Sequence, residues 1–82
     1  MPSGKKLVER FKTRPADFTW DEFGKMMASL GYEMMTAKGS ARRFFKKGKR
    51  RILYIHEPHP RKELKSYQVK QALEVLEENG DI

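Results

Sequence analysis

A sequence of 82 residues, 38% of them hydrophobic, permits one small domain with one core and leaves no room for a second domain. It contains no cysteine, so disulfides and thiolate metal sites are excluded and helix and sheet packing must hold the fold. The formal net charge of +7 favours a polyanionic partner, either nucleic acid or an acidic protein, over an acidic small substrate.

The first predicted element is a short helix over residues 5–11. A helix over these residues places Leu7, Val8 and Phe11 on one side. We expect Arg14-Pro15 to end the helix, because the residue before a proline avoids helical geometry. We predict that the helix docks on the core.

The second helix has a clear start at Thr19. Thr19 and Glu22 match the T-x-x-E capping box, while Phe18 and Phe23 match a hydrophobic staple. Gly31 suits the left-handed residue that ends the helix. The residues that recur at the spacing of a single buried helical stripe are Phe23, Met26, Met27 and Leu30.

Three strand-like runs follow, at residues 32–36, 42–46 and 51–55. Gly39-Ser40 and Lys47-Gly48-Lys49 supply the turns between them. Strands joined by such short turns pair antiparallel, so these runs predict a three-stranded antiparallel sheet.

Helical periodicity returns after the strands, with Ser66 as the predicted amino-terminal cap and Gly80 as the stop. The apolar residues of this helix are Val69, Ala72, Leu73 and Leu76. Two amphipathic helices need the same apolar surface. We therefore predict an α+β fold in which the helices cover one face of the sheet and the other face is left for water or a partner.

The most strongly charged segment is residues 38–51, which carries eight cations and no carboxylate. Its net charge of +8 exceeds the +7 of the whole chain. Cations interleaved with aromatic residues are typical of a nucleic-acid binder. The plainer alternative is a solvated edge hairpin that its charges keep soluble.

Both histidines, His56 and His59, follow the last predicted strand. Imidazoles beside a basic hairpin suit acid–base chemistry near neutral pH, such as metal-free cleavage of RNA through its 2′-hydroxyl. The structural alternative is that Pro58 and Pro60 fix a tight exit from the sheet while the histidines hydrogen-bond the backbone. Two histidines without a thiol do not suit a zinc site, so we expect no metal and no other cofactor.

Four motifs in a fixed order resemble the HicA toxins of bacterial type II toxin-antitoxin modules, over Asp17 to Ile82. The motifs are Phe18-Thr19-Trp20-Asp21-Glu22, Leu30-Gly31-Tyr32, Lys38-Gly39-Ser40 and His59-Pro60-Arg61-Lys62-Glu63-Leu64-Lys65. The resemblance implies a small version of the double-stranded-RNA-binding fold, of order α-β-β-β-α. It also implies a ribosome-independent, metal-free endoribonuclease that cleaves messenger RNA and is neutralised by a HicB-like antitoxin.

The resemblance also suggests the domain boundaries. We expect a single domain over residues 1–82, with residues 1–16 as an amino-terminal extension that adds a short helix and residues 17–82 as the HicA-like core. The amino terminus lacks the apolar stretch of a signal peptide, and no segment approaches the length of a membrane span. We expect a cytoplasmic protein with no membrane partner.

One position departs from the family pattern. These toxins carry a catalytic histidine directly after the Gly-Ser pair, where this chain has Ala41, and alanine cannot transfer a proton. Three explanations stay open: an inactivating substitution, a branch that relocates its acid–base group, and a branch that binds RNA without cutting it. If the acid–base group is relocated, the candidates are His59 and His56, both of which we expect near the Gly-Ser turn.

We predict that RNA binds the basic hairpin, where phosphate contacts give salt-dependent and sequence-independent affinity. The predicted RNA-binding residues are Lys38, Gly39, Ser40, Arg42, Arg43, Lys46 and Lys49. Phe44, Phe45 and Tyr54 are candidate surfaces for unpaired bases, although strand alternation places some of them in the core. The alternative class is a non-catalytic RNA-binding module or a basic protein-interaction module.

Overall fold

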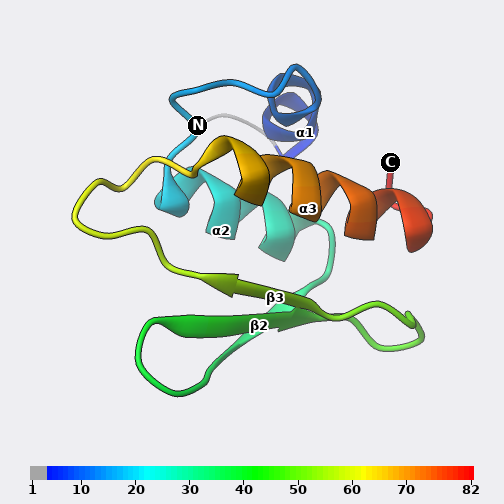
Figure 1. Cartoon of the computed structure of the whole chain (residues 1–82). Helices are drawn as coiled ribbons and strands as arrows, with labels where there is room; N and C mark the ends of the chain where they lie inside the picture. Colours follow the sequence, from blue (N-terminus) through cyan, green and yellow to red (C-terminus); the bar gives the residue numbers. More distant parts are fainter. Residues whose placement is uncertain (1–3) are drawn as a thin grey trace.

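The computed structural model describes residues 4–82 and has the predicted α+β architecture, with a helix added before the α-β-β-β-α order. The elements are α1 (Gly4–Lys12), α2 (Trp20–Ser29), β1 (Glu33–Thr36), β2 (Ala41–Phe45), β3 (Leu53–His56) and α3 (Ser66–Glu78). The strands pair antiparallel in the order β1-β2-β3. Helices α2 and α3 cover one face of this sheet, and no described element covers the other (Figure 1).

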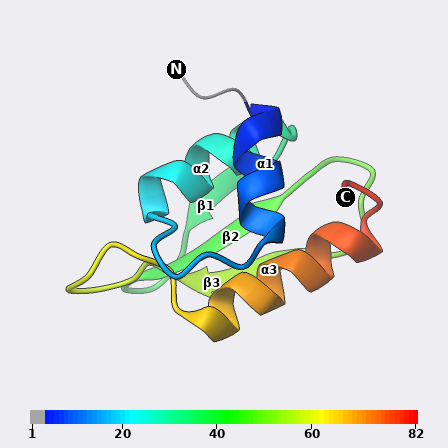
Figure 2. The same cartoon turned by 90° about the horizontal axis from the view of Figure 1, so that it is seen from above.

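The core lies between the helices and the sheet. Phe44 of β2 packs edge-on against Phe23 of α2, with ring centroids 5.2 Å apart. Helix α1 packs against α2 (Figure 2) and buries Leu7 and Phe11, so the predicted docking of this helix is confirmed. The largest fully buried side chains are Phe11, Phe18, Phe23, Met26, Met27, Leu53, Leu76, Val69 and Val75.

Local signals account for the start and end of α2. The Glu22 N–H donates to Thr19 Oγ1 at 3.2 Å and the Thr19 N–H donates to Glu22 Oε1 at 3.0 Å, so the predicted capping box is confirmed. The Thr19 backbone donor and the Arg10 guanidinium lower the pKa of Glu22. Gly31 has a φ of 92°, which is the left-handed geometry predicted for it.

The predicted cap of α3 was wrong by one residue. Ser66 is the first helical residue and Lys65 holds the cap position. The Lys65 N–H donates to Gln68 Oε1 at 3.0 Å, so a side chain one turn inside the helix satisfies the donor of the cap residue. Gly80, with a φ of 79°, follows the last turn as predicted.

The third strand begins at Leu53, two residues later than the sequence pattern predicts. Asn79, after the end of α3, explains the difference. Its side chain accepts a hydrogen bond from the Arg51 N–H at 3.1 Å and donates one to the Arg51 carbonyl at 3.1 Å. Because both backbone groups of Arg51 bond this amide, the residue is held by the helix end and not by β2.

A hydrogen-bonded cluster around Asp81 closes the same end of the molecule. Asp81, whose side chain is 7% exposed, accepts hydrogen bonds from Tyr32 Oη at 2.6 Å and Lys46 Nζ at 2.9 Å. Burial alone would raise the pKa of Asp81, but these donors outweigh it and lower the pKa. Burial and the hydrogen bond to Asp81 raise the pKa of Tyr32 to about 12.

We expect Asp81→Asn to lower the free energy of unfolding by about 1–3 kcal/mol near neutral pH, because it removes two charge-assisted hydrogen bonds. A lowered folded-state pKa stabilises the fold above the usual carboxyl pKa, and this contribution is lost as the pH falls through the lowered value. Urea unfolding of the unsubstituted chain and of Asp81→Asn, at about pH 7 and about pH 2, tests this pH dependence. The stability difference should shrink in acid, and an equal difference at both pH values would contradict the assignment.

Candidate nucleic-acid interface

A histidine and the Gly-Ser turn meet at one end of the sheet. Ala41 of β2 is the register partner of His56 of β3, so the two residues lie side by side on the same face. Ser40 Oγ lies 3.1 Å from His56 Nδ1. Gln68 Nε2 donates to the His56 carbonyl at 2.9 Å, and the Glu57 N–H donates to the Ser40 carbonyl at 2.9 Å. The backbone on both sides of the Ser40–His56 pair is therefore held in place.

The structure separates the two histidines. His56 is exposed on the sheet face away from the helices, because its neighbour Ile55 is buried against them. His59 lies in the loop between β3 and α3, where it lines a shallow hollow with Ala16, Arg61 and Leu64. Of the two, His56 makes the hydrogen bond to the Gly-Ser turn.

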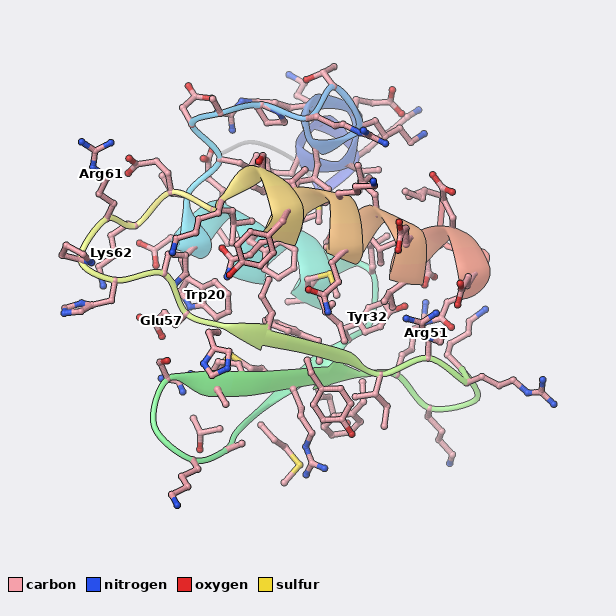
Figure 3. All side chains as sticks on the ribbon, viewed as in Figure 1. Trp20, Tyr32, Arg51, Glu57, Arg61 and Lys62 are labelled. Carbon is pink, nitrogen blue, oxygen red and sulfur yellow. The ribbon has the colours of Figure 1, made fainter. Side chains whose placement is uncertain are left out.

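The loop that carries His59 is anchored to α2 and to β2. The Trp20 N–H donates to the Lys62 carbonyl at 2.7 Å. Glu57 pairs with Arg42 at 3.3 Å and with Lys62 at 3.6 Å. Arg61 and Lys62 extend from this loop at the end of the molecule where Glu57 and Trp20 lie (Figure 3). The loop therefore adds exposed cations near the Ser40–His56 end of the sheet.

The basic run of residues 38–51 does not form one patch. Its two turns lie at opposite ends of the sheet (Figure 1), so its charge is divided. Lys38 is exposed in the turn beside Ser40, whereas Lys49 is exposed in the turn at the Asp81 end. Lys46 is also at that end, where it pairs with Asp81.

The two adjacent arginines of β2 lie on opposite sides of the sheet. Arg42 is partly buried on the helix side, where it pairs with Glu57 and donates to the Gly39 and Ala41 carbonyls at 3.0 and 2.9 Å. Arg43 lies on the open side beside its register partner Tyr54. Arg42 therefore ties the Gly-Ser turn to the loop after β3, whereas Arg43 lies on the face that no described helix covers.

The open face carries a row of exposed apolar and aromatic side chains. Tyr54 is 58% exposed and Met35 is 47% exposed, one on each side of Arg43. Farther along, Phe45 and Ile52 line a shallow hollow with Met35, Arg43 and Lys49. Of the three aromatic residues proposed as base surfaces, Tyr54 and Phe45 lie on this face, whereas Phe44 is in the core.

Sequence reasoning missed two groups of residues in this surface. Met35 and Ile52 join the open face through a register that the sequence does not specify. Arg61, Lys62 and Lys65 are exposed cations outside the basic run. Their close spacing in the chain was a usable signal for a second basic cluster.

Among residues 4–82, no three His, Asp or Glu side chains are grouped to hold a metal ion. Within the same residues, the helices lack the length and apolar character that a membrane span requires.

These features define a small basic α+β domain with a histidine on the open face of its sheet. The profile of the family described as the HicA toxin of bacterial toxin-antitoxin systems matches residues 20–77, from the start of α2 to the last turn of α3. The chain belongs to this family and is the toxin of a toxin-antitoxin system. Searches of curated proteins and of solved structures find no match.

Proposed function

We propose that this toxin is an endoribonuclease that cleaves messenger RNA and that His56 is its acid–base group. The observation that carries the proposal is the pairing of His56 with Ala41. The resemblance implies that the family carries its histidine at the position of Ala41, and the neighbouring strand brings an imidazole beside this position on the same face. The sequence leaves both His56 and His59 as candidates for a relocated acid–base group. The hydrogen bond to Ser40 favours His56.

The contact with the Ser40 hydroxyl is compatible with the tautomer that this chemistry requires. When His56 Nδ1 carries the proton and donates it to Ser40 Oγ, Nε2 is free to accept a proton. Nε2 takes the proton of the ribose 2′-hydroxyl while the 2′-oxygen forms a bond to phosphorus. The bond from phosphorus to the 5′-oxygen breaks, and that oxygen takes a proton from water. The hydroxide that remains takes the proton from His56 Nε2, which restores the neutral imidazole. The products are a 2′,3′-cyclic phosphate and a free 5′-hydroxyl.

Cations around the Ser40–His56 pair provide the electrostatic part of the proposal. Lys38, in the turn next to Ser40, is exposed and can stabilise the negative charge that develops on the phosphate. Arg61 and Lys62 lie in the anchored loop at the same end and can bind flanking phosphates. RNA affinity should therefore fall steeply with salt.

The partner that neutralises the toxin is proposed to be a HicB-like antitoxin. Covering the open face would block the Ser40–His56 pair, and an acidic antitoxin surface would complement the exposed cations. Occlusion of this kind needs no change in the toxin's own fold.

A metal-free cleavage assay tests the proposed activity. RNA is incubated in EDTA, without antitoxin, with the native chain and with Ala41→His. We expect both proteins to cleave, because each carries an imidazole at the same end of the open face. Cleavage by Ala41→His alone would show that the native chain lacks a working acid–base group. Cleavage by neither would favour the non-catalytic binding module.

A further inference from the structure

We infer that the open face binds unpaired nucleotides, with one base stacked on the ring of Tyr54, so that the substrate class is single-stranded RNA. The inference rests on the proposed function for the choice of RNA as ligand. It goes beyond that proposal because it assigns a binding site and a strand preference.

The position of Tyr54 relative to His56 is the first argument. The two residues are two apart on β3, and both are exposed while Leu53 and Ile55 are buried. Side chains two apart on one strand face are about 7 Å apart. A base on the Tyr54 ring would therefore belong to a nucleotide adjacent to the phosphate at His56.

The apolar character of this surface is the second argument. Tyr54, Met35 and Ile52 are 58%, 47% and 38% exposed, and they lie together on one sheet face. Large apolar side chains grouped in this way mark a surface that a partner covers. An aromatic ring beside a flexible thioether suits a flat, planar ligand, and stacking on such rings is how proteins hold unpaired bases.

The lack of an ion-pair partner for Arg43 is the third argument. Lys46, Arg42 and Arg51 pair with Asp81, Glu57 and Glu78 respectively. Among the described residues, Arg43 has no carboxylate partner, and its Nη2 donates a hydrogen bond to the Met35 sulfur at 3.8 Å. Its Nε is buried without a hydrogen-bond partner. A guanidinium held beside Tyr54 without a carboxylate partner is placed to bind a phosphate or a base carbonyl through its Nη groups.

These arguments favour a single strand over a duplex. In an A-form duplex the bases are stacked inside, and proteins recognise its phosphates, its 2′-hydroxyls and its overall shape. Neither a stacking ring nor the Met35 and Ile52 patch would find a partner on such a surface. The family resemblance implies a double-stranded-RNA-binding fold, but the exposed residues of the open face suit unpaired bases.

Binding of an uncleavable ligand tests the inference separately from catalysis. The probe is a fluorescently labelled 2′-O-methyl oligonucleotide of about 12 nucleotides, as a single strand and as a duplex, measured by anisotropy. We expect the single strand to bind at least about tenfold more tightly, and Tyr54→Ala to weaken it about tenfold, as loss of one stacked base does. Tyr54→Phe should bind within about twofold of the native chain, because it keeps the ring.

Tyr67 provides a matched control, since it is 62% exposed but lies on α3, away from the open face. Tyr67→Ala should leave affinity unchanged, and circular dichroism should show both alanine variants folded. Equal or tighter binding of the duplex, or equal effects of Tyr54→Ala and Tyr67→Ala, would overturn the inference even if RNA is cleaved. If neither oligonucleotide binds and only an acidic protein does, the inference and the proposed function both fail.

Discussion

His56→Ala is expected to slow RNA cleavage by at least about a hundredfold, because a general acid–base group contributes roughly 10²–10⁴-fold to such a reaction. The side chain lies on the exposed face of β3, so its removal should change stability little. Single-turnover cleavage of a labelled RNA in EDTA measures the effect. The binding of uncleavable RNA should stay close to that of the native chain.

His59→Ala is the matched control for this prediction, because it removes the other imidazole from the anchored loop. It should retain most of the cleavage rate. The double variant Ala41→His, His56→Ala is a stronger control, since it moves the imidazole across the register pair. This exchange should recover part of the lost rate. A large loss in His59→Ala with normal cleavage by His56→Ala would instead assign the chemistry to the loop.

Phe44→Ala is expected to lower the free energy of unfolding by about 3–5 kcal/mol, the usual cost of truncating a buried phenylalanine. Phe44 is 2% exposed and its ring lies 5.2 Å from Phe23 and 5.8 Å from Trp20. The substitution leaves a cavity between α2 and the centre of the sheet. Urea unfolding followed by circular dichroism measures the loss.

Phe45→Ala is the control, because the adjacent residue has the same side chain on the opposite face. It should cost about 1 kcal/mol or less in stability and should weaken the binding of single-stranded RNA. Equal destabilisation by the two substitutions would contradict the assignment of the faces.

The helices could be predicted well because their signals are local. The Thr19 capping box, the apolar spacing from Phe23 to Leu30 and the left-handed Gly31 each lie within a few residues of the feature that they specify. The strand order followed from turns too short to allow anything but antiparallel neighbours. The cap of α3 lies one residue before the predicted Ser66, because Gln68 bonds the Lys65 N–H and so places the cap at Lys65.

The distribution of the cations could not be predicted, because it depends on partners far away in the chain. Lys46 pairs with Asp81, and Arg42 pairs with Glu57. No sequence pattern indicates which exposed lysine or arginine will meet a carboxylate, so the run of eight cations predicts a single basic hairpin. Its division between two ends of the sheet emerges only from the fold.

The choice between the two histidines depended on the register of β3. A slip of one residue would turn His56 toward the core and Ile55 toward solvent. Burial of Leu53 and Ile55 under the helices fixes the register, and with it the place of His56 beside Ala41. The sequence could name both histidines but could not favour the one that contacts the Gly-Ser turn.

The most direct test of the central claim is the chemical nature of the ends that the native chain leaves on RNA. The purified chain is incubated in EDTA with a short single-stranded RNA, without antitoxin, and the products are analysed by mass spectrometry. We predict fragments that end in a 2′,3′-cyclic phosphate and begin with a free 5′-hydroxyl. Intact RNA, or fragments that carry a 5′-phosphate, would contradict the proposed function.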